Sequence, residues 1–172
     1  MKLVGALLLA ITLAFAKRPS AATLPVACGD DKTTFDVKVQ KDQPAPAPTD
    51  PGSAQIVFVE RFENVGFCVG CKVTTRVGVD GQWVGADRGN SYFAYTVTPA
   101  EHHLCVNWQG VQGHGVASLK AEPGKVYYFA INVKIRQDQS GIEQHLDLAA
   151  LNEDEGKYLA KTSALAAATP RR

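Results

Sequence analysis

Hydrophobic and polar positions alternate with a period of two over most of the chain, a pattern that is typical of β-strands. In the segment 72–79, for example, Val73, Thr75, Val77 and Val79 share one face. The same pattern predicts strands over 54–60, 82–86, 91–98, 102–109, 117–122, 125–135 and 143–151, and a short one over 35–39. Short strands separated by Gly, Pro and Asp predict an all-β fold, an antiparallel β-sandwich.

Two local signals add detail to this fold. Asp80-Gly81 separates two predicted strands, and this pair favours a two-residue hairpin because both of its central residues need a positive φ. Near the C-terminus, Asn152 can cap a short helix, and the acidic residues 153–155 suit the positive end of a helix dipole. We expect this short C-terminal helix to end near Lys161.

The N-terminus has the pattern of a secretory signal. Lys2 precedes an uncharged run over 3–16, which is shorter than the roughly 20 apolar residues of a membrane span. Cleavage sites of the small-x-small type end at Ala16 and at Ala22. Composition then divides the chain into a signal peptide (1–22), a leader segment with a Pro-rich linker (23–53), a β-sandwich domain (54–162) and a disordered tail (163–172).

The balance of charged residues limits the classes of partner that the sequence predicts. The chain has 18 Lys+Arg against 17 Asp+Glu, without a basic patch or aromatic residues clustered among cations, so we expect no nucleic acid as a partner. We also expect no membrane span, and no cofactor is needed to complete the core. An exported chain would be periplasmic or secreted, where an even number of cysteines indicates disulfides.

The four cysteines allow one favoured pairing. Cys68 and Cys71 can bridge if 68–71 forms a β-turn, because such a turn brings the outer Cα atoms within about 7 Å. Cys28 and Cys105 then pair by elimination. That bridge would tie the leader to the strand predicted over 102–109, and it would contribute about 4 kcal/mol in the chain-entropy model. Pairing of Cys28 with Cys68 or Cys71 is the alternative arrangement.

The same cysteines raise other chemistries. Cys68 and Cys71, with Cys105 and either His102 or His103, have ligand types that suit zinc. The two histidines are adjacent on a predicted strand, so only one of them could face such a site. Haem attachment and thioredoxin-like redox chemistry have weaker support, because Lys72 follows Cys71 where haem attachment needs a histidine, and a strand rather than a helix is predicted there.

No catalytic motif is visible. The chain lacks Gly-x-Ser-x-Gly, and no helix is predicted after the glycine-rich segment 110–116 that could cradle a phosphate. An aromatic sugar-binding platform is a further candidate, but these side chains are more often core residues and cross-strand pairs. It would be drawn from Trp83, Tyr92, Phe93, Tyr95 and Trp108.

The segments 74–108 and 117–133, together with the leader segment 28–39, carry a family resemblance. They resemble the bacterial family catalogued as domain of unknown function 2846 and, more distantly, modules of the PEGA type. The resemblance implies an exported β-sandwich and no activity. We therefore expect a non-enzymatic binding or structural module of the cell envelope, with an envelope protein or a glycan as its partner. A thiol-redox or metal-binding protein that uses Cys68 and Cys71, and a carbohydrate-binding module, are the alternatives.

Overall fold

A computed structural model describes residues 25–43, 50–65, 73–109, 113–138 and 141–171. These residues form strands and one helix in the order predicted from the alternating pattern, with one strand that the pattern did not predict. The elements are β1 (Thr34–Gln40), β2 (Ala54–Val65), β3 (Thr75–Val79), β4 (Gln82–Asp87), β5 (Ser91–Val97), β6 (Glu101–Trp108), β7 (His114–Lys120), β8 (Val126–Asp138), β9 (Gly141–Leu151), α1 (Glu153–Thr162) and β10 (Ala164–Arg171).

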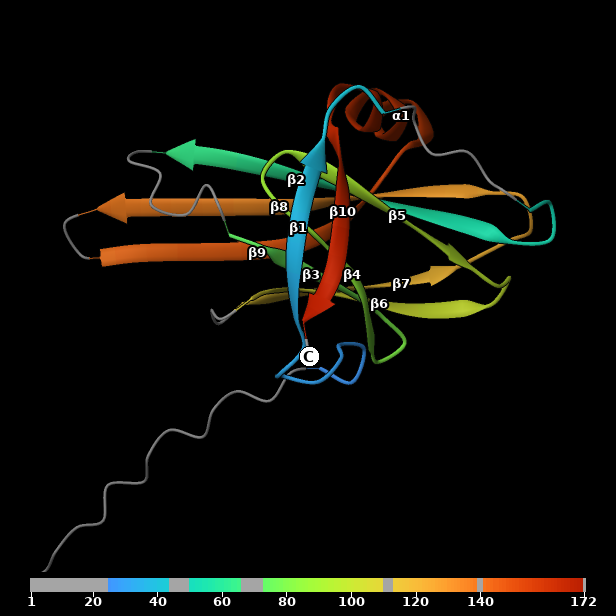
Figure 1. Ribbon diagram of the computed structural model, residues 1–172, viewed down its shortest axis with the longest axis horizontal. Helices are drawn as coiled ribbons and strands as arrows, with labels where there is room; N and C mark the ends of the chain where they lie inside the picture. Colours follow the sequence, from blue (N-terminus) through green and yellow to red (C-terminus); the bar gives the residue numbers. More distant parts are fainter. Residues whose placement is uncertain (1–24, 44–49, 66–72, 110–112, 139–140, 172) are drawn as a thin grey trace, which may run out of the picture.

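The strands form two sheets, which confirms the all-β sandwich with a C-terminal helix (Figure 1). One sheet has four strands in the order β4-β3-β6-β7, and all of its pairings are antiparallel. The other has six strands in the order β1-β10-β5-β2-β8-β9. It is mixed rather than wholly antiparallel, because β2 pairs with β8 in parallel and β10 pairs with β5 in parallel.

The core lies between the two sheets and is built from the alternation seen in the sequence. Ile56 and Phe58 of β2 meet Val77 of β3 and Leu104 of β6, and all four side chains are fully buried. Phe58 also stacks on Phe129 of β8, with ring centroids 6.1 Å apart. Burial of a large apolar side chain stabilises a folded protein by about 1.5–3 kcal/mol. The interface between the two sheets is therefore the main source of stability.

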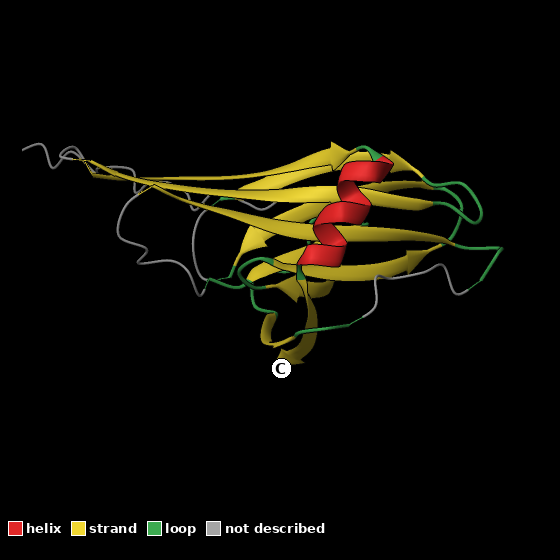
Figure 2. Cartoon of the chain, turned by 90° about the horizontal axis from the view of Figure 1, so that it is seen from above, coloured by secondary structure: helices red, strands yellow, loops and turns green. Residues whose placement is uncertain are grey.

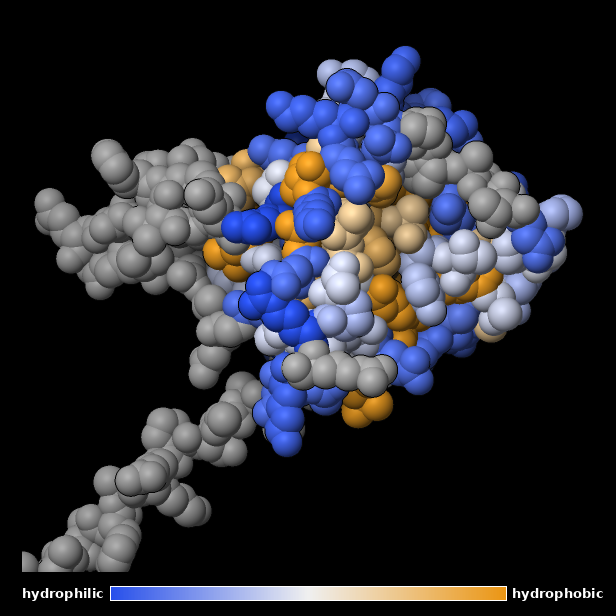
Figure 3. All heavy atoms as spheres, in the orientation of Figure 1, coloured by the Kyte–Doolittle hydropathy of each residue, from blue (hydrophilic) through white to orange (hydrophobic). Residues whose placement is uncertain are grey.

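The segment 163–172 is not a disordered tail: residues Ala164–Arg171 form β10. This strand pairs antiparallel with β1 from Leu165 to Arg171, and the two cross over β4 and β5 (Figure 1). Small side chains make the close crossing possible, and Ala166 packs with Phe35 and Ala86 in a separate apolar cluster. Figure 3 shows apolar residues gathered over the middle of this face, with hydrophilic residues around them.

The leader also belongs to the sandwich, since β1 lies within the segment that composition assigned to leader and linker. The domain therefore extends beyond the predicted 54–162 at both ends. The Pro-rich residues 44–49 lie outside the part of the chain that is described.

Helix α1 begins and ends almost where the sequence predicts. The Asn152 side chain accepts a hydrogen bond from the Glu155 N–H, and three acidic residues occupy the first turn. The helix lies across the outer face of the six-stranded sheet (Figure 2), where Ala160 and Tyr128 share an apolar cluster. Gly156 is buried against Tyr128, close enough that an added Cβ would lie 2.1 Å from the Tyr128 Cγ.

Candidate functional site

A disulfide joins the leader to the four-stranded sheet. Cys28 and Cys105 are separated by 77 positions in the sequence, yet their Cα atoms lie 5.1 Å apart. Both side chains are buried, and Cys105 lies in the middle of β6. The predicted Cys28–Cys105 pairing is confirmed. Cys68 and Cys71 lie outside the described residues, so their pairing stays a prediction.

Arg76 forms a second attachment between the leader and this sheet. Its guanidinium is buried and donates one hydrogen bond to the Thr33 carbonyl (2.8 Å) and another to the Asn107 side chain (3.2 Å). It also lies 4.4 Å from the centre of the Trp83 ring, a cation–π contact. Burial lowers the pKa of Arg76, while the negative charges of Asp30 and Asp31 oppose this, and the group keeps its charge.

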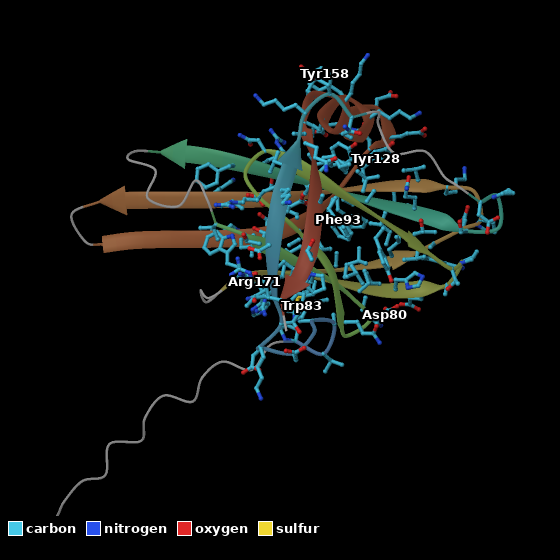
Figure 4. All side chains as sticks on the ribbon, viewed as in Figure 1. Asp80, Trp83, Phe93, Tyr128, Tyr158 and Arg171 are labelled. Atoms are coloured by element: carbon cyan, nitrogen blue, oxygen red, sulfur yellow. A yellow bond between two sulfur atoms is a disulfide. The ribbon has the colours of Figure 1, made fainter. Side chains whose placement is uncertain are left out.

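The attached leader and strands β6 and β7 enclose a groove of about 650 Å³, which we call the leader groove. It lies beside the β3–β4 turn, where Figure 4 places Asp80 near the leader. Val26 is 97% exposed and Val116 is 52% exposed, so apolar surface faces solvent here. The lining residues are Pro25, Val26, Ala27, Asp80, His103, Val116, Ala117 and Ser118.

The carboxylate in the leader groove is already paired. Asp80 accepts the His103 backbone N–H through one oxygen (2.8 Å) and contacts the buried His102 Nδ1 through the other (2.7 Å). The His102 Nε2 lies 2.8 Å from the Thr98 carbonyl, so both ring nitrogens face acceptors, an arrangement that favours the doubly protonated imidazolium. Burial lowers the pKa of His102, but the Thr98 carbonyl and Asp80 outweigh it and leave the pKa above its ordinary value.

The polar pair in the groove is poorly suited to nucleophilic catalysis. The Ser118 hydroxyl lies 3.4 Å from the His103 Nδ1, and both residues are exposed. A catalytic histidine needs a third group that orients its ring, and the nearby Asp80 carboxylate is already bonded to His102 and to the His103 backbone N–H. The pair can hydrogen-bond a ligand, but it lacks the arrangement that activates a serine.

The zinc set that the sequence suggested does not form. Cys105 is bonded to Cys28 and cannot ligate a metal as a thiolate. His102 and His103 point to opposite faces of β6, as predicted: the first is buried and the second exposed. Within the described ranges, no three His, Cys, Asp or Glu side chains are grouped closely enough to hold a metal ion.

The five aromatic residues do not form one exposed surface. Tyr92 and Trp108 are buried in different clusters, and Phe93 packs against the core. Trp83 is covered by Arg76 and donates its indole N–H to the Asp30 carbonyl (2.5 Å). Tyr95 lines a smaller pocket of about 340 Å³ beside His102.

Sequence reasoning did not predict the leader groove. Its walls at Pro25–Ala27 and Val116 carry no motif, and they come together because the leader is attached to the four-stranded sheet, in part through the Cys28–Cys105 bond. The predicted disulfide was the one signal that could have pointed to this surface.

In the described part of the chain, no helix is long and apolar enough to span a membrane. Comparisons with protein-family models, with curated proteins and with solved structures find no match to the chain.

Proposed function

We propose that this protein is an exported, non-enzymatic β-sandwich module that acts by binding in the cell envelope, with the leader groove as its contact surface. The observation that carries the proposal is the Cys28–Cys105 disulfide, which ties the leader to the four-stranded sheet next to Pro25–Ala27, the leader residues that line the groove. Structural disulfides persist in oxidising compartments, which supports a periplasmic or secreted location. The uncharged run over 3–16 supports export independently.

The chemistry of the groove favours an uncharged, apolar partner surface. Val26 and Val116 present apolar side chains, and the Asp80 carboxylate is already bonded to His102 and to the His103 backbone N–H. Of the residues that the structure describes, no Trp, Tyr or Phe lines the groove to stack on a sugar ring. We therefore favour the apolar side chains of an envelope protein over a glycan as the occupant.

Export is tested by expressing the full chain in a bacterial host and isolating the mature protein from the periplasm or the medium. Intact mass should give an N-terminus at Lys17 or Thr23, and peptide mapping without reduction should recover Cys28 joined to Cys105. Retention of Met1 in a protein with four free thiols would contradict the proposed location.

Binding at the groove is tested with the neutral apolar probe N-phenyl-1-naphthylamine. Its fluorescence should rise with the oxidised protein, and Val116→Asp should abolish the rise by placing a charge on the groove wall. Tyr158→Asp is the matched control, because Tyr158 is an exposed apolar residue on α1, away from the groove. Equal fluorescence from the two variants would exclude the groove as the binding surface.

A further inference from the structure

Two acidic side chains are buried between the sheets at one end of the core. Glu60 of β2 is 3% exposed, and Asp87, at the end of β4, is fully buried. Glu60 lies on the face of β2 that carries Ile56 and Phe58, and Asp87 pairs with Thr75 of β3 on the opposite sheet. The two carboxyl groups therefore come from different sheets and meet in the interior.

Each carboxyl group is only half satisfied. Glu60 accepts the Gly89 N–H (2.9 Å) through Oε1, and Asp87 accepts the Ser91 hydroxyl (3.0 Å) through Oδ1. The second oxygen of each, Glu60 Oε2 and Asp87 Oδ2, lacks a well-formed hydrogen bond to any described residue. Buried polar atoms are normally paired, so these two oxygens need an explanation.

Among the described residues of the surrounding elements, no cation neutralises them. On β2, Arg61 is exposed and pairs with Glu155 of α1, and on β3 the Arg76 guanidinium points to the leader. Arg88 is next to Asp87 in the sequence, and its positive charge helps to lower the pKa of Asp36 on β1. The facing positions on the remaining elements are uncharged: Ser91 on β5, Trp108 on β6 and Ile131 on β8.

We propose that Glu60 and Asp87 form a proton-binding pair between the two sheets, which holds this end of the sandwich closed while it is protonated and loosens it when both carboxyls ionise. A proton on one carboxyl supplies the missing donor and removes the repulsion between two buried negative charges. A metal ion is a poorer explanation, because calcium takes six to eight oxygen ligands and the free oxygens here are few.

The titration of the pair agrees with this geometry. Burial raises the pKa of Glu60 to about 7, against the opposing effects of the Gly89 N–H, which Glu60 accepts, and of the nearby Thr75 hydroxyl. Burial, and then the charge of Glu60, raises the pKa of Asp87 well above its ordinary value. A folded-state pKa above the unfolded value means that the stabilisation is present at low pH and is lost as pH rises through the folded-state value. The loss therefore begins above the ordinary carboxyl range and continues to about pH 7 for Glu60.

The test measures unfolding of the mature, oxidised protein by denaturant between about pH 5 and about pH 8, in the presence of EDTA. As pH rises through this range, the unfolding equilibrium constant of the wild type should increase by up to about tenfold per pH unit for one linked proton. Glu60→Gln keeps a neutral side chain at every pH, so its unfolding should depend less on pH. Glu122→Gln, at an exposed carboxyl, is the control and should follow the wild type.

A second measurement works on the wild type alone, in case Glu60→Gln does not fold. Carbon-13 NMR of the side-chain carboxyls should show Glu60 titrating near 7 rather than in the ordinary Glu range. An ordinary value, or a Glu60→Gln variant with unchanged pH dependence, would overturn the proposal. A rise in stability with calcium or magnesium chloride that Glu60→Gln removes would also overturn it, in favour of a metal site.

Discussion

Asp80 and Gly81 each have two roles. Both adopt positive φ, 50° and 81°, which confirms the predicted two-residue turn between β3 and β4. The same residues contact other elements: the Gly81 N–H donates to the Ala27 carbonyl of the leader, and Asp80 bonds to His102 and His103 of β6. One turn therefore positions both walls of the leader groove.

Substitution of Gly81 tests this turn. Gly81→Val should lower the free energy of unfolding by about 1 kcal/mol or more, because a β-branched residue is strained at positive φ. An added Cβ would also lie 3.1 Å from the Val26 carbonyl oxygen, so the leader would have to shift. Denaturant unfolding measures the effect, and Gly52→Ala is the control, since a Cβ there meets only ordinary contacts. Equal stability of the two variants would refute the strained turn.

The sequence predicts only one role of each such residue. The Asp-Gly pair identifies the turn because its requirement is local, confined to the φ angles of two neighbours. The bond between Asp80 and His102 depends on β3 lying beside β6, which no local pattern encodes. For the same reason the sequence does not predict the Glu60–Asp87 pair: the two residues are 27 positions apart and come from different sheets.

Replacement of Gly156 in helix α1 should have an effect on stability opposite to the one that helix propensity predicts. Gly156→Ala would stabilise an isolated helix by up to about 1 kcal/mol. In this protein we expect Gly156→Ala to lower the free energy of unfolding by about 1–3 kcal/mol. The new Cβ would overlap the side chain of Tyr128, on which the helix packs (Figure 4).

A double-mutant cycle assigns the cause. In a Tyr128→Ala background the penalty for Gly156→Ala should disappear, because the overlapping ring is gone. Lys161→Ala, at an exposed position of the same helix, should change stability by no more than about 0.5 kcal/mol. A stabilising Gly156→Ala in the wild type would show that the helix does not pack this closely.

Strand β10 was missed because alanine has little intrinsic preference for strands. Its extended conformation depends on its neighbours: β1 pairs from Leu165 to Arg171, and β5 pairs at Ala164 and Leu165. The strands with β-branched and aromatic residues were predicted correctly, because their own side chains favour the pleated conformation. Their parallel pairing, β2 with β8, was not, because pairing direction depends on how distant segments meet.

Removal of residues 164–172 should therefore lower the thermal unfolding midpoint and expose the leader to proteolysis. β10 lies between β1 and β5 in the sheet order, so its loss leaves β1 without a strand partner in that sheet. Arg171→Ala is the control: it removes the ion pair between Arg171 and Asp36, which are both exposed, and should change the unfolding midpoint much less than the truncation does. An unchanged protease pattern after truncation would contradict a structural role for β10.

The whole sandwich depends on links between distant parts of the chain, and Cys28–Cys105 is a covalent link of this kind. Replacement of both cysteines by alanine should lower the free energy of unfolding by up to about 4 kcal/mol, since the bridge closes a loop of 77 residues. In the Cys68→Ala, Cys71→Ala background, where a reductant can break only the Cys28–Cys105 bridge, unfolding with and without the reductant should give the same difference.

The Cys68→Ala, Cys71→Ala variant is the matched control. A bridge between those residues would close a much shorter loop, so its loss should cost less in the chain-entropy model. A larger loss from this pair than from Cys28 and Cys105 would mean that the leader is held mainly by Arg76 and by the pairing of β1 with β10.

The pairing of β1 with β10 also sets a limit on when the protein can fold. Thr34 lies opposite Arg171, so the sheet cannot be completed until the ribosome has synthesised nearly all of the described chain. Strand β1 must wait for its partner while the intervening strands emerge, and contacts this distant in sequence form slowly. The six-stranded sheet therefore stays incomplete during synthesis, and the export proposed above requires a chain that has not finished folding. For a chain exported as proposed, the sheet and the Cys28–Cys105 disulfide would be completed only after translocation.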